Sequence, residues 1–308
     1  MNWFFIAMIA PALHAVTNCI DKFFIETYIA KDTENKEEVG SLILFSSLFT
    51  VFALPFILLF QPHVLNVSIT SALTLILGGI ITEIAIILYL YALEKDESSI
   101  VTPFFLLIPV FGYFLGFIFL GETLSLNQIF FSLLIILASA LLSLDLTGAK
   151  VKLRGHVVLL MSGSSFLYAL TYVIFKKMAI EDGYWLSSFW IFTGMLISGI
   201  LIFIFKKNYR DDFIQVFRKY SGTIIFINFF SEIITIIADF IYFYSSLQAP
   251  IALVMMMNVF QPFFVFLYGI FLTLFFPHIA TEKLSKKHLT QKIIAIATMM
   301  LGSFFLYY

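Results

Sequence analysis

The chain has 308 residues, of which 61% are hydrophobic, only 12% are charged and 39 are phenylalanines. Soluble domains are about half apolar and about a quarter charged, so this composition excludes an ordinary soluble domain and predicts a chain that lies in lipid. The formal net charge of −1 provides no basic surface for a nucleic acid. The single Cys19 excludes an internal disulfide and a CxxC metal site.

Apolar runs long enough to cross a membrane follow one another along the whole chain. A hydrocarbon core about 30 Å thick needs about 20 apolar residues per helix. We therefore predict an all-α integral membrane protein with about ten transmembrane helices. The predicted spans are 2–28, 39–60, 69–93, 99–120, 127–146, 156–178, 184–206, 222–247, 251–276 and 289–308. Between the seventh and eighth spans, the helical spacing of Phe213, Phe217 and Tyr220 predicts a short amphipathic helix lying in the membrane interface.

The second half of the sequence repeats features of the first. The matching pairs are Leu13 and Leu167, Lys22 and Lys176, Tyr89 and Tyr242, Pro109 and Pro262, Gly116 and Gly269, and Glu122 and Glu282. All pairs but the last lie 153 or 154 residues apart, and the last implies about seven inserted residues near 276–280. We predict five-helix repeats at 1–146 and 156–308, joined by a linker at 147–155. Five is an odd number, so the second repeat crosses the membrane in the opposite sense and the repeats are inverted.

Three short motifs of the first half are informative about the family. They are Tyr91-Ala92-Leu93, the run LIPVFG at 107–112, and Gly121-Glu122-Thr123-Leu124 before the fifth predicted helix. Together they resemble the EamA-like family of the drug/metabolite transporter superfamily. The second half is divergent, because Leu274 and Phe275 stand where glycine and glutamate would fall. The resemblance implies a ten-helix fold with a central cavity, and an exporter or exchanger of amino acids, metabolites or drugs.

Several polar side chains lie within the predicted spans, although an ionisable group there costs at least about 2.5 kcal/mol. Helical spacing places His14, Asn18 and Asp21 on one face of the first helix. Tyr168 and Tyr172 lie at the related positions of the sixth helix, and Asn258 and Gln261 lie close to Pro262. The predicted substrate or ion pathway consists of His14, Asn18, Asp21, Glu83, Tyr168, Tyr172, Glu232, Asp239, Asn258 and Gln261. A structural role stays open for each, since a buried histidine or protonated carboxyl also ties helices together.

Four further charged residues have simpler expected roles. Lys22 and Lys176 lie near predicted helix ends, and their side chains are expected to extend to the lipid headgroups. Glu122 and Glu282 precede the fifth and tenth helices and are expected to cap those helices, because a carboxylate favours a helix N-terminus. We also expect the GxxxG formed by Gly112 and Gly116 to allow close helix packing.

Motifs of membrane enzymes and of ATP-driven pumps are missing from the sequence: there is no HExxH, GxSxG or Walker A pattern. We predict no enzyme, cofactor or metal, and a secondary transporter in the cell (inner) membrane that exports or exchanges small molecules. The expected partners are that substrate, lipid and protons, with no nucleic acid, and the chain acts as a monomer or homodimer. A non-transporting scaffold and a lipid-modifying enzyme are the alternatives; the enzyme would need reactive groups at one interface, whereas the deep polar groups here gather near mid-membrane.

The orientation has two opposing indications. Most lysines and arginines lie in the connections after odd-numbered helices, and the positive-inside rule then places both termini outside. The family resemblance implies both termini inside, and we expect this arrangement because the basic connections are also the longer ones. A reporter fused after Tyr308 is expected to be active on the cytoplasmic side, and activity on the outer side would establish the orientation indicated by the charges.

Overall fold

The computed structural model describes residues 3–24, 39–95, 101–143, 155–219, 222–275 and 286–307, and within these ranges every regular element is a helix. The elements are α1 (Trp3–Phe24), α2 (Val39–Phe49), η2 (Thr50–Phe52), α3 (Ala53–Phe60), η3 (Pro62–Leu65), α4 (Ile69–Lys95), η4 (Thr102–Leu107), α6 (Ile108–Leu120), α7 (Leu126–Ser143), α8 (Gly155–Asp182), α9 (Tyr184–Phe205), α10 (Lys207–Lys219), α11 (Gly222–Ser246), α12 (Ile251–Met257), η5 (Asn258–Phe260), α13 (Gln261–Phe275) and α14 (Lys286–Tyr307).

Eight segments of the described chain are long and apolar enough to cross a membrane, and α7 and α14 contain shorter apolar stretches. Large apolar side chains cover the outside of the molecule, and Leu59, Ile69 and Leu126 each expose more than three quarters of their surface. Such exposure is unfavourable in water and favourable against lipid tails. The chain is therefore an integral, multi-pass membrane protein, as the composition predicts.

Three of the predicted spans are interrupted helices. The fourth consists of η4 and α6, and the ninth consists of α12, η5 and α13. Pro262 is the second residue of α13, and in an uninterrupted α-helix its ring would clash with the carbonyl of Asn258. The second span is likewise divided into α2, η2 and α3, with Pro55 in the first turn of α3. The chain thus adopts 3₁₀ turns close to the prolines.

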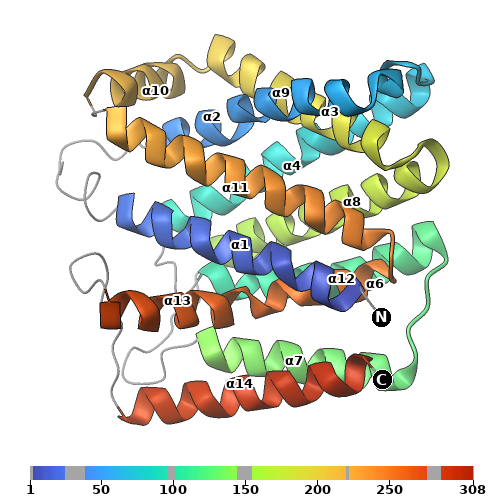
Figure 1. Cartoon of the computed structure of the whole chain (residues 1–308), viewed down its shortest axis with the longest axis vertical. Helices are drawn as coiled ribbons and strands as arrows, with labels where there is room; N and C mark the ends of the chain where they lie inside the picture. The colour runs from blue at the N-terminus through green and yellow to red at the C-terminus, as the bar shows by residue number, and fades with distance from the viewer. Residues whose placement is uncertain are drawn as a thin grey trace.

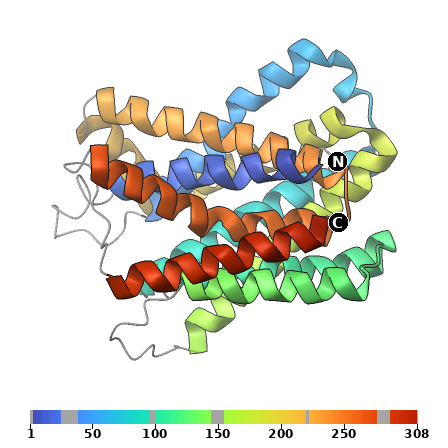
Figure 2. The same ribbon diagram turned by 60° about the horizontal axis from the view of Figure 1, so that its bottom comes forward.

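Helices of the first and second halves of the chain pack against each other. In the first half, α4 contacts α8 and α9, and α1 contacts α11 and α13. The helices α7 and α14 lie side by side at one edge (Figures 1 and 2). Both chain ends lie at the same end of the molecule, from which α1 and α12 begin (Figure 1).

Hydroxyl groups link the two halves inside the protein. Ser164 donates a hydrogen bond to the carbonyl of Ala85 at 2.8 Å, which joins α8 to α4. Ser139 on α7 donates to the carbonyl of Val259 in η5, also at 2.8 Å. Since lipid tails provide no hydrogen-bonding groups, such bonds between helices satisfy hydroxyl groups that would otherwise have no hydrogen-bond partner.

The amphipathic helix predicted between the seventh and eighth spans is present as α10. It packs against α2 and α9, and the rings of Phe213 and Phe45 lie 4.8 Å apart. The hydroxyl groups of Tyr209 and Tyr91 form a hydrogen bond of 2.6 Å. Protein therefore covers part of the apolar face that the sequence analysis assigned to the membrane interface.

Candidate functional site

Polar residues from α1, α4, α8 and α11 gather within the helical body. Nε2 of His14 on α1 lies 3.6 Å from Oδ1 of Asp239 on α11, a distance that suits an ion pair but is too long for a hydrogen bond. The side chains of His14 and Asp239 expose 20% and 23% of their surface, so neither is fully enclosed by the protein. The sequence analysis placed both residues in the pathway, and the structure brings them together.

Glu83 on α4 is the most enclosed of the predicted carboxyl groups. Its exposure is 1%, and neither of its oxygens has a hydrogen-bond partner among the described residues. Its carboxyl lies close enough to that of Glu232 on α11 for the two to interact electrostatically. Two carboxylates so close repel each other when both are charged, and a proton or a bound cation relieves that repulsion.

Aromatic rings surround these carboxyls. Tyr168 and Tyr172 lie on α8, and Tyr168 interacts electrostatically with both Glu83 and Asp239. The rings of Tyr172 and Tyr242 have their centres 4.5 Å apart, and Tyr172 also interacts with Asp239. The hydroxyl of Tyr242, a residue that is 1% exposed, has no hydrogen-bond partner within the described part of the chain. We refer below to His14, Glu83, Tyr168, Tyr172, Glu232, Asp239 and Tyr242 as the central cluster.

Tyr242 is a member that the predicted pathway omitted. It is the repeat counterpart of Tyr89, so the internal repeat contained the signal for it. Tyr89 lies on α4, and its ring is 4.8 Å from that of Phe105, which in turn is 5.9 Å from the ring of Tyr168. The repeat-related Tyr89 and Tyr242 therefore both lie near tyrosines of α8.

The remaining predicted residues lie on the elements around the central cluster. Asn18 is exposed on α1, and of Asp21 the structure describes the helical backbone alone. Asn258 in η5 and Gln261 at the start of α13 are half-buried, and both elements pack against α1. No partner for Oδ1 of Asn258 is found among the described residues. Their assignment to the pathway stays a prediction.

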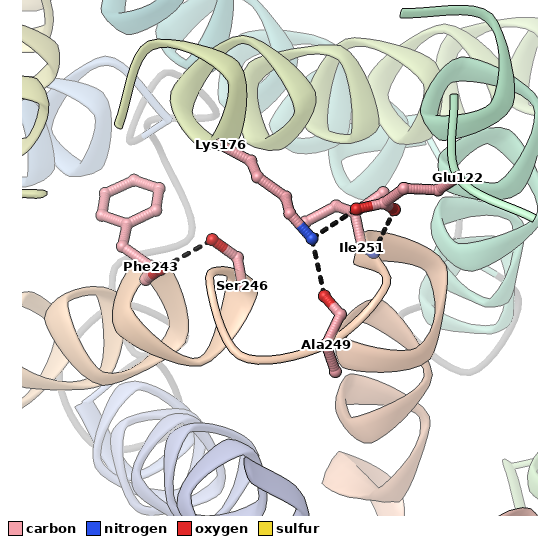
Figure 3. A network of polar contacts seen from close by, with 6 residues as sticks. All are labelled: Glu122, Lys176, Phe243, Ser246, Ala249 and Ile251. Carbon is pink, nitrogen blue, oxygen red and sulfur yellow. Dashed lines mark hydrogen bonds and ion pairs between the residues drawn. The ribbon is translucent and has the colours of Figure 1, made fainter. Parts of the chain in front are cut away.

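A second polar site, shown in Figure 3, links three distant parts of the chain. Nζ of Lys176 on α8 forms an ion pair with Glu122 and donates a hydrogen bond to the carbonyl of Ala249 at 2.6 Å. The other carboxyl oxygen of Glu122 accepts a hydrogen bond from the backbone N–H of Ile251 at 2.6 Å. We call these four residues the Glu122–Lys176 network.

The Glu122–Lys176 network shows that the roles predicted for Lys176 and Glu122 are wrong. Lys176 is 5% exposed and ion-paired inside the protein, so it does not extend to the headgroups. Glu122 does not cap the helix that follows it, because Gly121 has the left-handed φ of 66° and ends α6 with a turn that leads Glu122 to α12. Ser125 and Gln128 cap α7 instead, by reciprocal hydrogen bonds of 2.9 and 3.2 Å. The side chain of Lys22 and the whole of Glu282 lie outside the described residues.

Comparisons with known proteins agree with this architecture. A crystal structure is similar to this chain with a TM-score of 0.67 at 12% sequence identity, over 98% of this chain and 94% of that one. At this identity the similarity establishes a shared fold and nothing about activity. No curated protein matches the chain by sequence. Residues 3–144 match the model of the EamA-like transporter family. The predicted family resemblance is thereby confirmed for the first half of the chain, and the chain is a multi-pass membrane protein in which residues 3–144 are similar to the EamA-like transporter family.

Proposed function

We propose that the protein is a secondary transporter of small molecules that works by alternating access between two inverted five-helix repeats. The packing of the helices supports this arrangement, since contacts between the halves occur in repeat-related pairs. α1 against α11 corresponds to α8 against α4, and α1 against α13 corresponds to α8 against α6. Repeat-related helices thus meet at a common centre, where inverted-repeat transporters hold their substrates.

The buried carboxyl of Glu83 is the observation that carries the proposal of proton coupling. It has no hydrogen-bond partner among the described residues, and it lies near the carboxyl of Glu232. A carboxyl so enclosed is costly to keep unless it exchanges a proton or binds a cation during function. In the proposed cycle, protons and substrate compete for the central cluster. This competition couples export of the substrate to entry of protons.

The Glu122–Lys176 network contributes to the same cycle. It ties the connection after α6, in the first half, to α8 and α12 in the second half. The connection from α6 to α7 lies at the end of the molecule that carries both termini (Figure 1). The network therefore holds that end closed in this conformation, and it must separate when the end opens.

Glu83→Gln tests the coupling, because glutamine keeps the shape of the side chain and removes its titration. We expect proton-driven transport to fall at least about tenfold, while exchange of substrate for substrate persists. Both rates are measured in proteoliposomes with and without a pH gradient, using a substrate found by comparing metabolites inside and outside cells with and without the protein. Normal transport with unchanged pH dependence would show that Glu83 is a packing residue.

The same comparison distinguishes a transporter from a non-transporting scaffold. A scaffold tolerates replacement of its deep carboxyl groups without any change in metabolites. We expect Asp239→Asn to remove the metabolite difference while the protein remains folded and at normal abundance in the membrane.

A further inference from the structure

We propose that the central cluster binds an organic cation, an ammonium compound with an apolar body, in preference to an amino acid or an organic anion. This inference rests on the proposed transport function and names the class of substrate. Three features of the cluster support it: the charge of the cluster, the buried groups that have no partner among the described residues, and the tyrosine rings.

The charge of the cluster favours a cation. It contains the carboxyls of Glu83, Glu232 and Asp239, and His14, which already lies 3.6 Å from Asp239, is its one basic side chain. Glu83 is 1% exposed, and neither of its carboxyl oxygens has a hydrogen-bond partner among the described residues. A positively charged ligand would provide that partner and compensate the charge of the carboxylate. Lys176, which lies four residues after Tyr172 on α8, already forms an ion pair with Glu122.

The rings favour an organic cation over a metal ion. A hard metal cation needs several oxygen or nitrogen ligands at once. In the described part of the chain, no three His, Cys, Asp or Glu side chains are placed to hold such an ion together. Tyr168 and Tyr172 instead lie beside the carboxyls, with Tyr242 packed against Tyr172. Aromatic rings attract an ammonium group by cation–π interaction and also pack against an apolar body.

The same groups disfavour an amino acid. The carboxylate of a zwitterion would lie near Asp239 and Glu83 and be repelled by them, and His14 is already engaged by Asp239. A cation without a carboxylate avoids this repulsion. The cluster thus selects by charge first and by its tyrosine rings second.

The test uses the purified full-length protein in detergent and isothermal titration with benzyltrimethylammonium, whose charge does not depend on pH. Phenylalanine and 3-phenylpropanoate serve as a zwitterion and an anion of similar size. We expect the cation to bind at least about tenfold more tightly than either. Tighter binding of phenylalanine or 3-phenylpropanoate would overturn the inference.

Variants locate the binding in the central cluster. We expect Glu83→Gln to weaken binding of benzyltrimethylammonium about tenfold, and Tyr172→Leu to weaken it between about threefold and thirtyfold. Tyr172→Phe keeps the ring and should bind like the original protein. Asp211→Asn, which removes a carboxylate of 55% exposure on α10, is the matched charge control and should have no effect. If Tyr172→Leu binds as tightly as Tyr172→Phe, the rings do not hold the cation and the inference is wrong.

Failure of this inference is distinguishable from failure of the proposed function. If the cation does not bind but Glu83→Gln still abolishes proton-driven transport of another compound, the protein is a transporter and the substrate class is wrong. If the cation binds as described but neither proton-driven transport nor exchange occurs, the site is correct and the transport function is wrong.

Discussion

Replacing Lys176 with methionine is expected to destabilise the protein by about 3–5 kcal/mol, which is the usual cost of removing one partner from a buried ion pair. Lys176 is 5% exposed and compensates the charge of Glu122. Methionine fills a similar volume but leaves that carboxylate with the N–H of Ile251 as its remaining partner in the network. Reversible unfolding in mixed micelles of dodecyl sulfate measures the change in unfolding free energy.

Two controls separate the ion pair from the loss of a lysine. Lys177→Met removes an exposed charge from the neighbouring position of α8 and should change stability by less than about 0.5 kcal/mol. The double variant Glu122→Gln, Lys176→Met removes both charges and should recover most of the lost stability, since glutamine can still accept the hydrogen bond from Ile251. Equal stability of Lys176→Met and Lys177→Met would contradict the described network.

Gly194→Ala is expected to destabilise the protein by about 1–3 kcal/mol, although alanine usually favours a helix over glycine. Gly194 on α9 faces α4, where an added Cβ would collide with the backbone carbonyl of Ile76. At Gly79 on α4, an added Cβ would likewise collide with the carbonyl of Ile191. The two helices therefore touch backbone to backbone, and no side-chain rearrangement can make room for a methyl group.

Gly163→Ala is the matched control for this prediction. Gly163 also lies in a membrane helix, but the nearest neighbour of an added Cβ would be the terminal Cδ1 of Leu88 at 3.3 Å, which can rotate away. We expect this variant to be neutral or up to about 1 kcal/mol more stable. The same unfolding assay gives both values, and a Gly194→Ala protein as stable as Gly163→Ala would show that α4 and α9 are not in direct contact.

The sequence by itself was sufficient for the class of protein and for much of the central cluster. Span length and apolar composition are local properties, and they placed the long helices close to their observed positions. The cost of an ionisable group in lipid is also a property of single positions, so Glu83, Glu232 and Asp239 stand out from the sequence alone. The motifs before α7 were sufficient for the family resemblance that residues 3–144 confirm.

Only the tertiary structure decided which of these groups meet. Glu122 precedes α7 in the sequence, yet the left-handed turn at Gly121 directs it to Ile251, 129 residues away. Lys176 lies near a helix end, where a lysine usually extends to the headgroups, and the partly buried carboxylate of Glu122 holds it inside instead. Such pairings depend on how distant helices pack, and helical periodicity describes one helix at a time, so the sequence indicated the groups and the packing chose their partners.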